Sequence, residues 1–154
     1  LYPMYRGVAS LAGMSSSNSD PADLTGQIEA CSRAMEDGCD FVFLHHKYTD
    51  SAGEDGDHRR KTAEIERFDQ ALPDLLDLGF DVVCITGDHS TPCPMKLHSW
   101  HPVPVLVNGG PQRTGWNCRF TERECASGAL GTFMGKELMQ ILMAAAGRLS
   151  KFGA

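Results

Sequence analysis

The chain has 154 residues, of which 42% are hydrophobic and 22% charged, which is the usual balance of a single globular domain. Its formal net charge of −6, with no cluster of Lys and Arg, argues against a nucleic-acid partner. No apolar run approaches the roughly 20 residues of a membrane-spanning helix, and no signal peptide opens the chain. The six cysteines form no Cys-x-x-Cys pair, which argues against a zinc ribbon and indicates reduced thiols in a cytoplasmic protein.

The first predicted helix follows a Ser-rich stretch, with Asp20 and Pro21 suited to its cap and first turn. Apolar residues then recur at helical spacing until Gly38. Residues 41–44, Phe-Val-Phe-Leu, form an unbroken apolar run that predicts a strand buried on both faces. Residues 47–57 are polar and glycine-bearing, so we expect a loop that ends on Asp57 as the cap of the next helix.

The rest of the chain continues the alternation of helices and strands. An amphipathic helix is predicted from His58, with Pro73 either kinking it or starting a new turn. Residues 81–86 and 102–107 predict two further strands, and residues 134–146 predict a terminal helix. Strand, helix and strand in this order predict a parallel crossover. We therefore predict an α/β fold of three layers, with a mainly parallel sheet flanked by helices.

Two clusters of polar side chains follow the first two predicted strands. Asp50 and Glu54 lie four residues apart in the first cluster. The second cluster offers Asp88, His89, His98 and His101. Because the carboxyl ends of parallel strands meet at one edge of a sheet, the two clusters are expected to lie together. Carboxylates combined with imidazoles are suitable ligands for Zn, Mn or Fe, so the sequence predicts a metal site.

Each part of this pattern also has a simpler interpretation, because acidic loops are usually solvated and a lone histidine is more often structural. An EF-hand is excluded, since aligning Gly56 with its invariant glycine leaves Ser51 and Gly53 where oxygen-rich ligands belong and Thr62 where the bidentate Glu belongs. Ser90 and Cys93 lie near His89, yet neither has the sequence context of a nucleophile elbow or a papain-like site. No catalytic nucleophile is therefore predicted in this chain.

Two phrases together resemble the archaeal type of cofactor-independent phosphoglycerate mutase: Thr-Gly-Asp-His-Ser-Thr-Pro at 86–92 and His-Ser-Trp-His-Pro-Val-Pro at 98–104. The resemblance extends through residues 2–7, 47–57 and 147–154, so it covers essentially the whole chain. That family is similar to the alkaline phosphatase superfamily, which binds two divalent metals around a transiently phosphorylated serine. The resemblance implies a cytoplasmic isomerase of glycolysis and gluconeogenesis that interconverts 3-phosphoglycerate and 2-phosphoglycerate without 2,3-bisphosphoglycerate.

The resemblance also implies a role for each candidate ligand. Asp88 and His89 match the ligands of the metal that holds the nucleophilic serine, and Asp50 and His98 match ligands of the second metal. Glu54 stands where most of the family has a histidine, and we expect it to be a ligand that favours Mn or Mg over Zn. His101 matches a residue that is often not a ligand, so we leave it out of the metal site.

Other parts of the family's site have no match in this sequence: the serine, an amino-terminal acidic ligand and an inserted substrate-binding domain. Residues 1–154 are therefore expected to be the C-terminal part of the metal-binding domain, with 1–14 re-entering after the insertion and 134–146 as terminal helix. We expect the chain alone to be inactive. The alternatives are another phosphatase or phosphomutase of the same superfamily, or a non-catalytic α/β module.

Overall fold

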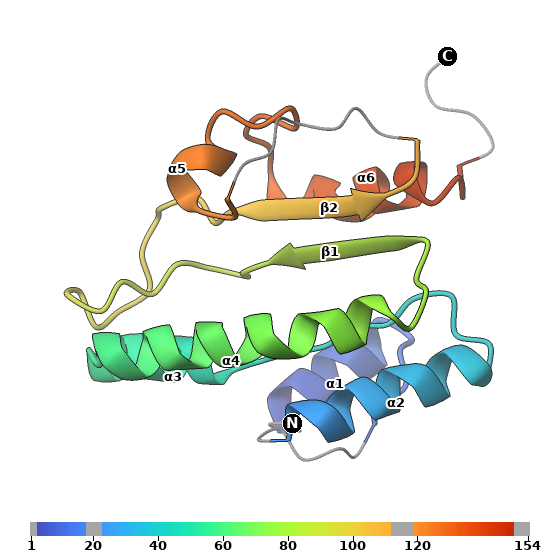
Figure 1. The fold of residues 1–154 in the computed structure, drawn as a ribbon, viewed down its shortest axis with the longest axis horizontal. Coiled ribbons are helices and arrows are strands. Elements are labelled where there is room, and N and C mark those ends of the chain that lie inside the picture. The colour runs from blue at the N-terminus through green and yellow to red at the C-terminus, as the bar shows by residue number, and fades with distance from the viewer. Residues whose placement is uncertain (1–2, 18–22, 112–118, 150–154) are drawn as a thin grey trace. The chain divides into compact units, whose positions relative to one another are not determined.

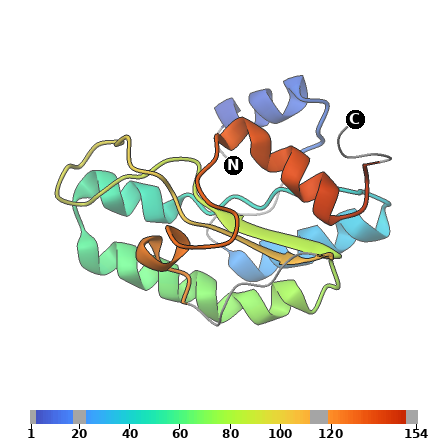
Figure 2. The same ribbon diagram turned by 90° about the horizontal axis from the view of Figure 1, so that it is seen from above.

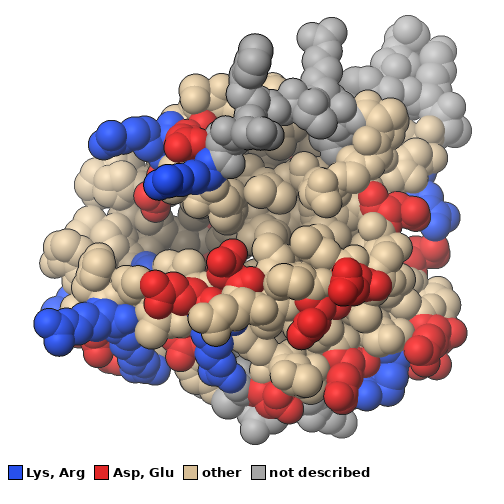
Figure 3. Space-filling view, in the orientation of Figure 1, with Lys and Arg blue, Asp and Glu red and all other residues tan. Residues whose placement is uncertain are grey.

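A computed structural model of the chain describes residues 3–17, 23–111 and 119–149 (Figure 1). The chain divides into two compact units. The first unit comprises Leu1–Ala52 and Asp57–Leu78, and the second comprises Gly53–Gly56 and Gly79–Ala154. Within the described residues no helix is both long enough and apolar enough to cross a membrane. On the face drawn in Figure 3, acidic side chains are interspersed with Lys and Arg, in keeping with the net charge of −6.

Helices build the first unit, which contains α1 (Pro3–Leu11), α2 (Leu24–Glu36) and α4 (His58–Leu76). The predicted helix up to Gly38 is confirmed as α2, because Leu24, Ile28 and Cys31 are buried at helical spacing. The proposed cap and proline, Asp20 and Pro21, lie outside the described residues. Leu24 and Ile28 line a small apolar pocket with side chains of α4, including Phe68, Leu72 and Leu75.

The predicted strand at 41–44 is not confirmed, because these residues lie in an irregular segment at 40–47. A strand buried on both faces should hide both of its phenylalanines, but Phe41 is 44% exposed and Phe43 is 67% exposed. The segment forms no ladder with a named strand in the described residues. An apolar run becomes a strand only where neighbouring strands complete its backbone hydrogen bonds.

The predicted loop at 47–57 is wrong, because it contains α3 (Tyr48–Asp55). The helix ends in a Schellman motif, in which the Gly56 amide donates to the Gly53 carbonyl (3.0 Å) and the Asp57 amide to the Ala52 carbonyl (2.9 Å). Gly56 has φ +74°, the left-handed conformation that this motif requires. The polar composition that suggested a loop belongs to a short helix with a well-formed end.

The long helix α4 starts and continues as the sequence indicates. The Asp57 carboxylate accepts a hydrogen bond from the Arg60 amide at 2.9 Å, which confirms the predicted N-cap. Pro73 lies inside the helix and does not end it, since α4 runs on to Leu76. A proline only three residues before the end of a helix removes a single backbone hydrogen bond.

The second unit contains a two-stranded sheet formed by β1 (Val82–Thr86) and β2 (Val105–Gly109). The strands are antiparallel, with Cys84 opposite Val107. Two short helical turns, α5 (Glu122–Cys125) and η1 (Gly135–Glu137), precede the terminal helix α6 (Leu138–Ala145), which packs on β1. Gly110, just after β2, leaves room for the backbone of Ala145, since a side chain there would overlap the Ala145 carbonyl.

The α/β class is confirmed, but the mainly parallel sheet is not. The strand at 82–86 lies within the predicted 81–86, the strand at 105–109 overlaps the predicted 102–107, and helix α6 lies within the predicted 134–146. The connection at 87–104 contains no crossover helix, and Figure 2 shows it extending past one end of the strand pair. A connection that returns at the same end reverses the chain direction, which makes the pair antiparallel.

Candidate metal centre

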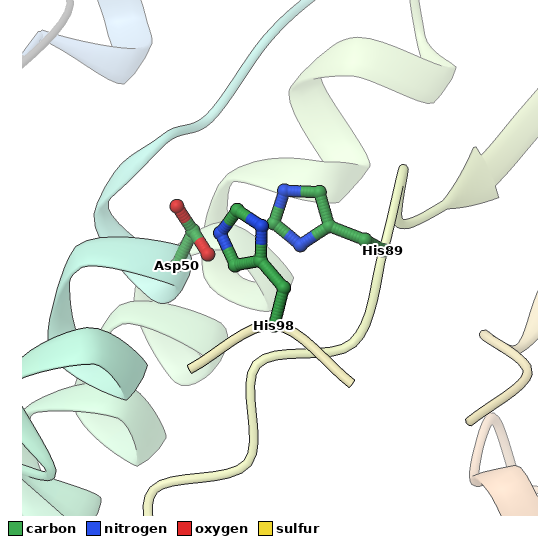
Figure 4. Close-up of side chains that lie close together, drawn as sticks. All are labelled: Asp50, His89 and His98. Atoms are coloured by element: carbon green, nitrogen blue, oxygen red, sulfur yellow. The ribbon is translucent and has the colours of Figure 1, made fainter. Parts of the chain in front are cut away.

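The loop between β1 and β2 carries three of the five predicted ligands: Asp88, His89 and His98. An antiparallel bridge closes the loop, with the Ser99 amide donating to the Ser90 carbonyl at 2.8 Å. Residues on either side of a bridged pair point to the same face, so His89 and His98 are diagonal neighbours on one face. Their rings stack with centroids 3.7 Å apart (Figure 4), and a ring nitrogen of one lies within 4.8 Å of a ring nitrogen of the other.

Polar groups lie beside both ring nitrogens of His89. Its Nδ1 lies 3.2 Å from the Thr91 hydroxyl, and Thr91 is only 3% exposed. Its Nε2 lies 3.4 Å from Oδ2 of Asp88, whose other oxygen accepts a hydrogen bond from the His89 amide at 3.0 Å. A histidine with one ring nitrogen held by a polar group presents the other in a fixed direction, which is how metal-binding histidines are oriented.

Glu54 reaches the same group of side chains from the last turn of α3. Its Oε1 lies 3.6 Å from Nε2 of His98. Both side chains are about half exposed, at 49% for Glu54 and 53% for His98. The second unit thus holds two carboxylates and two imidazoles in a chain of contacts that runs from Glu54 through His98 and His89 to Asp88. This donor set is suitable for a divalent transition metal such as Mn or Zn.

Asp50 lies in the first unit, in the first turn of α3 (Figure 4). It precedes Glu54 by four residues, so the two side chains share one face of the helix. Lys47 forms a close ion pair with Asp50. Burial lowers the pKa of Lys47, but the Asp50 carboxylate and Tyr5 outweigh that effect, so the net shift is upward. That Asp50 and the other four candidates bind metal together stays a prediction.

The sequence-based prediction missed His46, whose side chain is only 7% exposed. Its Nε2 lies 3.1 Å from Oε2 of Glu64 on α4, and its Nδ1 is buried with no hydrogen-bond partner in the described residues. Burial lowers the pKa of His46, and the neighbouring Glu64 opposes the shift without cancelling it. No sequence signal reveals this pair, because its members are 18 residues apart in unrelated elements.

The contacts of the remaining candidate residues are those of structural residues. His101, which we left out of the ligand set, has Nδ1 2.8 Å from the Ser99 hydroxyl and stacks on Trp100. Cys93 is buried, at 8% exposure, and Ser90 contributes its backbone to the bridge. These contacts give none of the three a reactive role.

Comparisons with known proteins show which proteins this chain resembles. The sequence profile of the metalloenzyme superfamily matches residues 5–145. Proteins from Thermus thermophilus and Aquifex aeolicus, each named "Probable 2,3-bisphosphoglycerate-independent phosphoglycerate mutase", are 47% and 46% identical over 99% and 100% of this chain. The chain spans 38% of the length of each. The solved structure of the PH0037 protein from Pyrococcus horikoshii is similar, with a TM-score of 0.89 and 38% identity, and the match covers 97% of this chain and 48% of that one.

Proposed function

Because the chain belongs to the metalloenzyme superfamily, we propose that it is part of a metal-dependent phosphoglycerate mutase. The whole protein would interconvert 3-phosphoglycerate and 2-phosphoglycerate without 2,3-bisphosphoglycerate. The observation that carries this proposal is the group of Glu54, Asp88, His89 and His98, with stacked imidazoles and a carboxylate beside each ring. The names of relatives that are 46–47% identical support the same activity.

In this proposal Asp88 and His89 hold one divalent ion, and Asp50, Glu54 and His98 hold a second. Thr91 keeps the ring of His89 in place, so that its Nε2 remains on the side of Asp88. The helical spacing of Asp50 and Glu54 directs both carboxylates to one side of α3. When bound, such a pair of ions would lower the pKa of a hydroxyl and neutralise phosphate oxygens. Carboxylate-rich ligands favour Mn or Mg.

The rest of the catalytic machinery would come from other parts of the protein. No residue of this chain matches the family's nucleophilic serine, so the chain would supply metal ligands while another segment supplies the phosphoserine. The chain spans 38% of the length of each of these relatives, which agrees with its being one part of a longer protein. In the complete, cytoplasmic enzyme we expect 41–44 to join a parallel sheet of a three-layer domain, with 1–14 entering it after the inserted domain and 134–146 as its terminal helix. The substrate would be a small phosphoglycerate, with neither nucleic acid nor membrane as partner.

The test uses the full-length protein, stripped of metal and then supplied with Mn²⁺. Formation of 2-phosphoglycerate from 3-phosphoglycerate is coupled to enolase. We expect metal-dependent turnover in the wild type and none in the isolated 154 residues. Asp88→Asn removes a charged ligand and should lower kcat/KM at least about 100-fold. Asp74→Asn, an exposed carboxylate of α4, is the matched control and should leave kcat/KM unchanged.

Three results would contradict the proposal. An Asp88→Asn enzyme as active as Asp74→Asn would remove Asp88 from the metal site. Robust mutase activity of the isolated chain would show that a nucleophile lies within it. Release of inorganic phosphate from 3-phosphoglycerate in place of isomerisation would identify a phosphatase of the same superfamily.

A further inference from the structure

Two glycines at the end of α3 lie against the loop that follows β1. A methyl group on Gly53 would overlap the carbonyl oxygen of Thr91 and lie 3.0 Å from its Cγ2. A methyl group on Gly56 would overlap Cε of Lys96 and lie 3.2 Å from its Cγ and Cδ. We call this group of two glycines and two loop residues the glycine seat: Gly53, Gly56, Thr91 and Lys96. At Gly53 the helix approaches the loop backbone more closely than a residue with a side chain would allow, whereas at Gly56 the close neighbour is the flexible side chain of Lys96.

The loop side of the seat is also unusual, because Lys96 has φ +53° and is the only described residue other than glycine with a positive φ. The left-handed conformation is costly for a lysine, and glycine would adopt it freely. A glycine at 96, however, could not place an aliphatic stem over Gly56. A conformation that is costly locally persists where the surrounding contacts require it. The backbone conformation at 96 would favour glycine, so the presence of lysine is better explained by the contact of its stem with Gly56.

The seat lies directly beside two of the candidate ligands. Glu54 directly follows Gly53 and precedes Gly56 by two residues, and His98 follows Lys96 by two residues. The bridge at Ser99 closes the loop just beyond His98. Glu54 Oε1 and His98 Nε2, which are carried by these two segments, lie 3.6 Å apart.

We propose that the glycine seat is a positioning device, which sets the spacing of Glu54 and His98 and thereby the affinity of the metal site that they share. This inference rests on the metal-dependent function proposed above. The four residues touch neither substrate nor metal; they act through the two ligands. In this proposal the affinity for metal depends on the aliphatic stem of Lys96 and does not depend on its charge.

The first experiment compares Gly53→Ala with Gly7→Ala in the full-length, metal-free protein. Both are helical glycines, but a methyl group on Gly7 would meet nothing within 4 Å. Alanine is the better helix former at both positions, so any difference between the variants comes from the contact with Thr91. In a calorimetric Mn²⁺ titration we expect Gly53→Ala to weaken one of two sites about tenfold and Gly7→Ala to weaken neither.

Hydrogen exchange of the metal-free protein gives a readout that does not depend on activity. We expect faster exchange of the Ser99 amide in Gly53→Ala than in Gly7→Ala, because the loop no longer packs closely against the end of α3. Unchanged Mn²⁺ affinity and unchanged exchange in a folded Gly53→Ala protein would overturn the proposal.

The second experiment compares Lys96→Met with Lys96→Gly, and it also serves if Gly53→Ala does not fold. Methionine keeps an unbranched stem and removes the charge, whereas glycine removes the stem and favours the left-handed backbone. We expect Lys96→Met to bind Mn²⁺ as the wild type does and Lys96→Gly to bind about tenfold more weakly. Equal weakening in both variants would assign the role to the charge and overturn the inference.

These measurements separate the two proposals. A wild-type protein that binds two Mn²⁺ ions but does not isomerise phosphoglycerate would contradict the proposed function and leave the seat testable by titration. If the wild type is a mutase and neither Gly53→Ala nor Lys96→Gly weakens Mn²⁺ binding, only the proposed role of the glycine seat is contradicted.

Discussion

The two segments that carry the candidate ligands hold their side chains in different ways. In α3 the local hydrogen bonds of a helix fix Asp50 and Glu54, and a Schellman motif at Gly56 completes its end. The loop after β1 has no regular structure around Asp88, His89 and His98, apart from the bridge between Ser90 and Ser99.

This difference indicates where the site is vulnerable. Ligands on a helix move only if the helix itself unfolds or shifts, since every turn repeats the same backbone bonds. Ligands on an irregular loop depend on a few long-range contacts, each of which is worth little alone. A single lost hydrogen bond should therefore disturb His98 far more than Glu54.

The largest expected effect comes from removing the bridge that closes the loop. Ser99→Pro deletes the amide that donates to the Ser90 carbonyl, so His98 is no longer held beside His89. We expect Mn²⁺ binding by the full-length protein to weaken about 10- to 100-fold in a calorimetric titration. Ser99→Ala keeps the amide and loses only the hydroxyl beside His101, so it should bind as the wild type does. Equal affinity in both variants would show that the bridge does not hold the ligands.

A cap substitution tests the helical side of the comparison. Asp57→Ala removes the carboxylate that caps α4 but leaves the backbone bonds that end α3. We expect the free energy of unfolding to fall by about 1 kcal/mol in a urea titration of the full-length protein. Because the ligands of α3 depend on its own backbone, Mn²⁺ affinity should stay within about twofold. A tenfold loss of affinity would mean that α3 relies on the start of α4.

The smallest effect concerns pH and the buried pair of His46 and Glu64. Burial lowers the pKa of the folded-state imidazole, despite Glu64, while the unfolded chain keeps the ordinary value. As the pH falls below that ordinary value the unfolded chain takes up the proton first. The stabilisation is complete above the unfolded pKa and is lost as the pH falls through the folded pKa.

His46→Gln removes this titration and keeps a donor for Glu64. Urea unfolding at about pH 7.5 and about pH 5.5 brackets the ordinary histidine pKa. Between these two conditions the wild type should lose more stability than His46→Gln, with all other groups contributing equally to both. A larger loss in the variant would mean that Glu64 outweighs burial and raises the pKa of His46.

Local patterns predicted those parts of the fold that local contacts determine. The helical spacing of Leu24, Ile28 and Cys31 was enough to place α2, and Asp57 was recognisable as a cap. α3 was missed because its Asp, Ser and Gly residues are typical of loops. The spacing of Gly53 and Gly56 was the available signal, since a glycine just past a short helix is typical of a Schellman ending.

Long-range contacts determine what the sequence did not reveal. Residues 41–44 have the composition of a buried strand, but strand formation depends on partners elsewhere in the protein. The polar clusters were identified because Asp88 and His89 follow an apolar run, yet the contact of Glu54 with His98 joins two segments that no local pattern connects. The partner of His46 lies on α4, which no local pattern indicates.

The antiparallel pair of strands also bears on how the isolated chain behaves at high concentration. Each strand has one outer edge along which, in the parts of the chain that the structure describes, no other strand forms a ladder. Amides and carbonyls on such an edge are a template for an extended segment of another molecule. β1, Val-Val-Cys-Ile-Thr, contains neither a charge nor a proline that would hinder this pairing. We therefore expect edge-to-edge self-association of the chain, which would increase with concentration and compete with recovery of the folded monomer.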